Sequence, residues 1–157
     1  MQTIERSIDV EVPVRAAYNQ WTQFEEFPSF MQDVERVEQH DDTTLEWHVS
    51  IAGADRSFET TITEQTPDHR IAWKTEPDSE TQHAGVVTFH RLDDQLTRVT
   101  LQMDVEPDDI VERVGTALGI TGAAIQRDLE SFKEFIEDRG GKETGAWRGE
   151  VDQNPEA

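Results

Sequence analysis

The sequence of 157 residues contains no cysteine and only three lysines. The lack of cysteine excludes disulfides, a thiolate nucleophile and zinc sites built on cysteine ligands. No stretch approaches the roughly 18 apolar residues of a membrane helix. The first residues, Met1–Arg6, show neither the apolar core nor the cleavage site of a secretory signal. We therefore expect a cytoplasmic protein with no stable membrane insertion.

Positive charge is also scarce: the chain has 14 Lys and Arg residues against 34 Asp and Glu residues, which gives a formal net charge of -20. Nucleic acids and anionic lipids are bound through clustered Lys and Arg, and no such cluster is present in the sequence. We expect no nucleic-acid partner. An acidic, lysine-poor composition is typical of halophilic proteins, with high-GC actinobacteria as the alternative source.

Aromatic residues are plentiful, with four Trp and seven Phe, although hydrophobic residues make up only 34% of the chain. So many large apolar rings are untypical of a disordered acidic chain, and the length suits one folded domain. We expect residues 1–139 to form a single domain. We expect residues 140–157 to form a polar C-terminal tail that carries Trp147.

The first two thirds of the chain show the period-2 alternation of strands. A strand is predicted over residues 3–12, followed by a short helix over 14–23 and a second, aromatic segment over 24–31 that Pro28 interrupts. Six further strands, separated by turn signals, are predicted over 34–39, 45–51, 56–65, 70–75, 83–92 and 97–105. Short loops between consecutive strands indicate an antiparallel sheet.

Past Pro107 the apolar period changes to three and four, which predicts a helix of some 30 residues ending at Arg139-Gly140. Glycines at 115, 119 and 122 lower its intrinsic stability, and we expect a kink near Gly119 to Gly122. The apolar stripe of this helix comprises Val111, Val114, Leu118, Gly122, Ile125, Leu129, Phe132 and Ile136.

Several segments resemble one known superfamily. The segment Trp21–Met31, which ends in Phe-Pro-Ser-Phe-Met, is similar to a segment of the polyketide cyclase/dehydrase and coenzyme Q-binding branch of the START-like (SRPBCC) superfamily. Residues 71–73, 85–89, 97–101 and 128–133 also match, and residues 145–151 are similar to the ending of a bacterial and archaeal subgroup, so the resemblance spans residues 2 to about 151. It implies an α+β helix-grip fold: a curved antiparallel sheet of about seven strands wrapped around a long C-terminal helix, with two short helices after the first strand.

An internal cavity is expected inside this fold. A strongly curved sheet around one helix is difficult to fill, the helix glycines remove side chains, and the resemblance itself implies a ligand pocket. A solid hydrophobic core is the alternative. The residues predicted to line the cavity are the inward-facing Trp47, Val49, Phe58, Trp73, His83, Phe89 and Met103 of the sheet, with Leu118 and Ile125 of the helix.

No constellation of residues in the sequence indicates catalysis. The five histidines form no HExxH helix and no close ligand pair, and there is no GxSxG elbow or Gly-rich phosphate loop. Adjacent carboxylates stand at turns and helix starts, where they cap or are solvated. We therefore expect no metal and no cofactor. His83, predicted to point inward near the mouth of the cavity, is a weak candidate for a catalytic acid or base.

The resemblance, together with the expected cavity, implies binding or transport of a small hydrophobic ligand, such as a lipid, an isoprenoid quinone or a polyketide-like compound. Two alternatives remain at this point. One is an enzyme of the polyketide cyclase or dehydratase type. The other is a regulatory protein-interaction module without a ligand, and a homodimer stays open in each case.

The charge predicts stability that depends on salt. Raising the salt from about 0.1 M to about 1 M shortens the Debye length from about 10 Å to about 3 Å and screens the repulsion among carboxylates. The melting temperature should therefore rise with KCl, measured by circular dichroism. A matched series in an uncharged osmolyte is the control, and a flat melting temperature in KCl would remove the halophilic interpretation.

Overall fold

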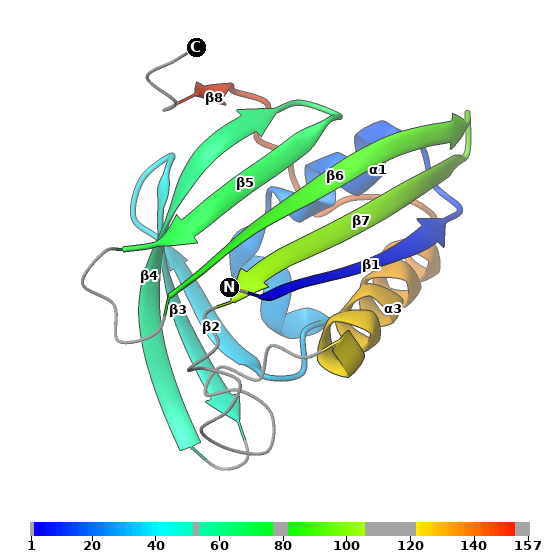
Figure 1. Ribbon diagram of the computed structural model, residues 1–157. Helices are drawn as coiled ribbons and strands as arrows, with labels where there is room; N and C mark the ends of the chain where they lie inside the picture. The colour runs from blue at the N-terminus through cyan, green and yellow to red at the C-terminus, as the bar shows by residue number, and fades with distance from the viewer. Residues whose placement is uncertain (1, 52–53, 77–81, 106–121, 153–157) are drawn as a thin grey trace.

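A computed structural model describes residues 2–51, 54–76, 82–105 and 122–152 (Figure 1). Within these ranges, no helix is long and apolar enough to cross a membrane. The elements in chain order are β1 (Gln2–Val10), α1 (Val14–Trp21), the 3-10 helix η1 (Phe24–Ser29), β2 (Val34–Gln39), β3 (Thr44–Ile51), β4 (Ala54–Thr66), β5 (Arg70–Thr75), β6 (His83–Asp93), β7 (Leu96–Val105), α3 (Gly122–Asp138) and β8 (Val151–Asp152).

The strands form one antiparallel sheet in the order β1-β7-β6-β5-β4-β3-β2, and β8 pairs with β4. Figure 1 shows this sheet curled around the helical elements, with α3 lying beside β1. Register shifts interrupt the pairing in β2, in β4 between Ile62 and Glu64, and near the end of β6. Such bulges bend and twist a strand, which lets the sheet curl.

This architecture confirms the predicted helix-grip fold, including the two short helices after the first strand. The second of them is a 3-10 helix, because Pro28 has no amide hydrogen to continue an α-helix. The described part of the C-terminal helix begins at Gly122. The predicted stripe residues Val111, Val114 and Leu118, and the expected kink near Gly119, lie outside the described residues.

An aromatic cluster joins the helices to the sheet. The indole of Trp21 in α1 lies 4.9 Å from the ring of Phe132 in α3, 5.6 Å from Phe27 in η1 and 6.3 Å from Phe89 in β6, measured between ring centroids. The Phe30 ring lies 5.4 Å from Phe132. All five side chains are buried, so this cluster forms the centre of the hydrophobic core.

The chain after α3 packs on the domain. Gly140 and Gly141 have positive φ angles of 68° and 80°, and the Gly141 amide donates to the Ile136 carbonyl, which ends the helix. Residues 143–148 then run along α1: the Asn19 amide donates to Glu143, and the Arg148 guanidinium donates to Asn19 Oδ1. Because β8 pairs with β4, this segment connects α1 to β4.

The buried face of α3 generates a stability prediction. Leu129 is fully buried against the sheet, so Leu129→Ala should lower the free energy of unfolding by about 2 to 5 kcal/mol, the range for truncating a core leucine. Urea denaturation measures it. Glu134→Ala, on the exposed face of the same helix, should change it by less than about 0.5 kcal/mol. Equal effects of the two substitutions would contradict this packing.

Candidate functional site

A cavity of about 140 Å³ lies between the inner face of the sheet and the helical elements. Its wall is mainly apolar. The described residues that line it are Trp21, Phe24, Phe27, Met31, Asp33, Val34, Leu45, Trp47, Val49, Phe58, Ile62, Ile71, Trp73, His83, Leu101, Met103, Ala124, Ile125, Arg127 and Asp128.

Two stacked rings form one wall. Trp47 of β3 and Phe58 of β4 are directly opposite in the strand register, and their rings lie nearly parallel, 8° apart in orientation, with centroids 6.1 Å apart. The indole Nε1–H of Trp47 donates a 2.9 Å hydrogen bond to the Thr60 hydroxyl. The polar edge of the indole is therefore satisfied within the wall, and its apolar face is available to the cavity.

A glycine sets the position of the second indole. Gly85 of β6 is paired with Trp73 of β5 on one side and with Met103 of β7 on the other. A Cβ atom at residue 85 would lie 2.5 Å from Trp73 Cζ2 and 2.7 Å from Met103 Sδ, which real Cβ contacts do not allow. Gly85 thus lets the Trp73 indole and the Met103 thioether approach the backbone of β6 and line the cavity.

His83 begins β6 and is 6% exposed. Its ring stands edge-on to Phe58 at 5.3 Å, and its backbone amide donates to the Thr75 hydroxyl. The imidazole Nδ1 is buried and has no hydrogen-bond partner among the described residues. Burial lowers the pKa of His83 to about 4, so the ring is neutral at pH 7. It offers one N–H donor and one nitrogen acceptor within an otherwise apolar wall.

A polar edge completes the cavity. The Arg127 guanidinium of α3 lies 3.2 Å from Asp33 Oδ2 and 3.2 Å from Asp128 Oδ1. Burial raises the pKa of Asp128, while the adjacent guanidinium acts in the opposite direction. The side chains of Arg127 and Asp33 are 37% and 31% exposed, so solvent reaches the cavity lining on this side.

The predicted cavity residues occupy different places. Trp47, Val49, Phe58, Trp73, His83, Met103 and Ile125 all line the cavity. Phe89 packs instead against Tyr18 and Trp21 in the core, and Leu118 lies outside the described residues.

Sequence reasoning placed Ile125 of the helix in the lining but did not include the aromatic segment 24–31, and it missed the polar edge. The dense aromatic residues of segment 24–31 were a signal for the first, because Phe24, Phe27 and Met31 line the cavity from η1 and its C-terminal end. No local pattern joins Asp33 to Arg127, which are 94 residues apart and meet only in the folded chain.

Groups that could hold a metal ion lie outside the cavity. Among the residues that the structure describes, they are the two overlapping sets Glu38, Glu46, His48 and His40, Glu46, Glu59, both on the outer face of the sheet. The sequence shows no close histidine pair. The β2–β3 pairing nevertheless brings His40 and His48 to the same glutamate.

The buried imidazole predicts a pH dependence of stability. His83 stays neutral in the folded protein down to about pH 4, whereas in the unfolded chain it takes up a proton near pH 6.5. The unfolded state therefore binds more protons between these values, and stability is lost as the pH falls through this window. At pH 4.5 the loss should be about 2 to 3 kcal/mol relative to pH 7.

Urea denaturation of the wild type and of His83→Gln at pH 7 and pH 4.5 isolates this contribution. On acidification the glutamine variant should lose less stability than the wild type, because the two proteins share every other titrating group. The difference should be about the loss predicted above for His83. His90→Gln, an exposed histidine of β6, is the control and should behave as the wild type. Identical pH dependence in all three proteins would show that His83 is not buried as a neutral ring.

Comparison with known proteins relates this cavity to a family. The profile of the family described as polyketide cyclase/dehydrase and lipid transport matches residues 10–137. A 17.2 kDa protein of Streptomyces lincolnensis, from the melC2-rnhH intergenic region, is 56% identical over 151 residues, covering 96% of this chain and 99% of that protein.

Solved structures share the fold. A Deinococcus radiodurans protein superposes with a TM-score of 0.70 at 22% identity, over 89% of this chain and 99% of that chain. The Zhui aromatase/cyclase of Streptomyces sp. R1128 superposes with a TM-score of 0.69 at 16% identity, over 88% and 95%. The chain belongs to the polyketide cyclase/dehydrase and lipid transport family of the START-like superfamily.

Proposed function

We propose that this protein binds and carries a small hydrophobic ligand that contains an aromatic or quinone ring with one polar substituent. The observation that carries the proposal is the cavity itself: aromatic walls around one neutral imidazole, whose Nδ1 has no hydrogen-bond partner among the described residues. A purely structural core would bury that nitrogen at a cost of about 1 to 3 kcal/mol without compensation. A protein-interaction module without a ligand would be expected to have a filled core.

The volume limits the size of the buried group. A dry cavity of about 150 Å³ lined by apolar side chains accommodates benzene. The cavity of about 140 Å³ therefore suits one six-membered ring, placed against Trp47, Phe58 and Trp73. A longer ligand, such as an isoprenoid quinone or an aromatic polyketide, would extend toward the partly exposed edge at Asp33 and Arg127.

The polar group of the ligand is expected at His83. A ring hydroxyl could donate to the unprotonated nitrogen of the imidazole, and a ring carbonyl could accept from its N–H. A simple acyl chain would leave the imidazole unpaired, so the geometry favours quinone or polyketide rings over fatty acyl chains. The description of the family, which names both polyketide conversion and lipid transport, supports this choice of ligand classes.

Cyclase or dehydratase activity is the second candidate, and the presence of an imidazole inside the cavity favours it. However, general acid-base catalysis is most efficient when the pKa lies near the working pH. With a pKa of about 4, His83 is a weak base at pH 7 and is better suited to orient a ligand than to remove its proton. Mass spectrometry of a bound polyketide separates a carrier, which leaves its mass unchanged, from a dehydratase, which removes one water. The absorption spectrum of the bound compound separates a carrier from a cyclase, which closes a ring without changing the mass.

The ligand proposal predicts a preference that calorimetry can measure. The protein should bind 2-naphthol saturably and about tenfold more tightly than naphthalene, because one additional hydrogen bond contributes about 1 kcal/mol. His83→Phe should remove this preference while still binding both compounds. Equal preference in the wild type and in His83→Phe would contradict the role of the imidazole.

The location of the ligand is tested by filling the cavity. Val49→Phe places a larger side chain inside it and should weaken binding of 2-naphthol at least about tenfold. Val86→Phe, the same substitution on the outer face of β6, should bind as the wild type. The thermal melt of each variant shows that it is folded. Binding that survives Val49→Phe in a folded protein would place the ligand elsewhere.

A further inference from the structure

The outer face of the sheet carries a row of like charges. Glu38 of β2 is directly opposite Glu46 of β3, and Glu46 is directly opposite Glu59 of β4. Like charges directly opposite one another destabilise a sheet. The chain already carries a formal charge of -20, which adds to this repulsion. The Arg36 guanidinium, 3.2 Å from Glu38, offsets part of this repulsion at one end of the row, and further positive charge beside Glu46 would offset more.

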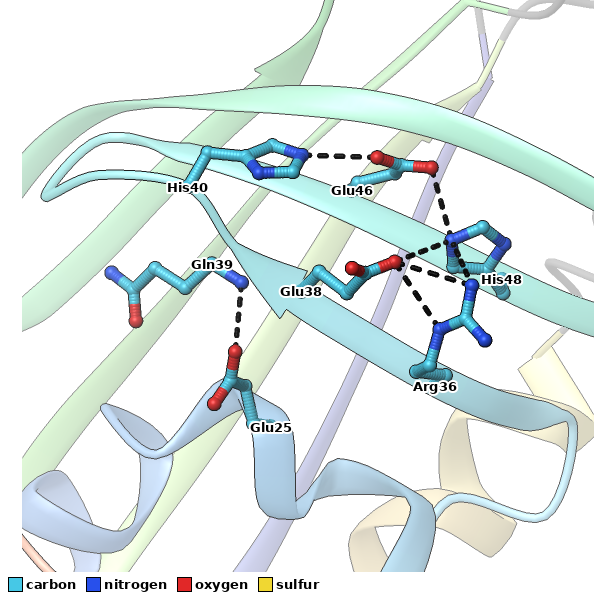
Figure 2. Close-up of polar contacts among 7 residues, drawn as sticks. All are labelled: Glu25, Arg36, Glu38, Gln39, His40, Glu46 and His48. Atoms are coloured by element: carbon cyan, nitrogen blue, oxygen red, sulfur yellow. Dashed lines mark hydrogen bonds and ion pairs between the residues drawn. The ribbon is translucent and has the colours of Figure 1, made fainter.

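Two imidazoles flank the central glutamate of this row (Figure 2). Glu46 Oε1 lies 3.0 Å from His40 Nε2, and Glu46 Oε2 lies 3.0 Å from His48 Nε2. The same His48 nitrogen lies 3.1 Å from Glu38 Oε2. One imidazole nitrogen and two carboxylate oxygens, from two neighbouring strands, thus converge on one point.

Neither hydrogen-bond role of His48 Nε2, donor or acceptor, suits all of its polar neighbours. As an N–H donor it suits the two carboxylates, but Arg36 Nη2, which forms an ion pair with Glu38 Oε2 at 3.2 Å, is also a donor and lies 3.2 Å from the same nitrogen. As an acceptor it can receive a hydrogen bond from Arg36, but it then has no proton to donate to the two carboxylates. A cation bound between the nitrogen and the two oxygens satisfies all three ligand atoms, and Arg36, whose side chain is 62% exposed, can turn to solvent.

We propose that His48, Glu46 and Glu38 bind one divalent transition-metal ion, with zinc as the best fit. In a tetrahedral zinc site, bonds of about 2.0 to 2.1 Å separate the ligand atoms by about 3.3 Å. The two separations from His48 Nε2, 3.0 and 3.1 Å, need to change by only a few tenths of an ångström. Mixed nitrogen and oxygen ligands favour zinc over magnesium or calcium, which prefer oxygen alone.

The remaining groups support this site. His40 contacts the other oxygen of Glu46 and holds that carboxylate in place, as partners of metal ligands commonly do. Water would occupy the fourth position, because the three ligand side chains are between 25% and 44% exposed. The ion would tie β2, the last strand of the sheet order, to β3. It would lie on the face opposite the cavity, so this proposal is independent of the ligand.

Isothermal titration with ZnCl2 tests the site, in about 1 M KCl with excess MgCl2 so that diffuse binding to carboxylates is screened. The wild type should bind one zinc ion saturably. His48→Gln and Glu46→Gln should weaken binding about tenfold or more. His90→Gln, the matched exposed histidine on the outer face of β6, should bind as the wild type. Arg36→Gln should bind at least as tightly, because a competing cation is removed.

The ring protons of His48 give a second readout that needs no substitution. In an NMR titration of the wild type, its resonances should shift until one equivalent of ZnCl2 is added, and those of His90 should not. No saturable binding, or equal binding by His48→Gln and the wild type, would overturn the proposal. Loss of binding in Arg36→Gln or in His90→Gln would overturn it as well, since neither residue is a proposed ligand.

Discussion

The contact of Trp21 with rings from three other elements is the interaction on which the rest of the structure depends. It joins α1 to η1, α3 and β6 through Phe27, Phe132 and Phe89. Because β6 and α3 lie far from α1 in the sequence, a single indole joins both α-helices to the sheet. Because Trp21 also lines the cavity, the same contact determines the distance between the helical side of the cavity and its sheet wall.

The curl of the sheet explains why space remains beyond this cluster. Bulges bend β2 and β4, so the strands on that side turn away from the aromatic core around Phe132. Near this core the interior side chains are shielded from solvent, as the full burial of Leu129 and Ile136 shows. Toward β3 and β4, rings that stack on one another cover the wall without filling the volume in front of it. The cavity is therefore a result of sheet curvature and of flat aromatic side chains.

Strand periodicity accounts for the part of the site that could be predicted from the sequence. Alternation identifies which residues face inward, and this suffices for Trp47, Phe58 and Trp73. It does not identify position along a strand: Phe89 shares a face with His83, but six residues of strand separate them by about 20 Å. Phe89 therefore packs beside α1 and does not line the cavity. The Asp33–Arg127 pair and the His40–Glu46–His48 group depend on tertiary and cross-strand pairing, which sequence spacing does not contain.

Neighbouring residues of β3 have opposite surroundings: Trp47 belongs to the cavity wall, and His48 belongs to the outer face. A substitution at an outward position leaves the volume and lining of the cavity unchanged, and an inward substitution leaves the surface charges unchanged. The two faces can therefore diverge independently during evolution, one residue at a time. An insertion or deletion of a single residue within β3 has the contrary effect, because it exchanges the two faces and removes both arrangements at once.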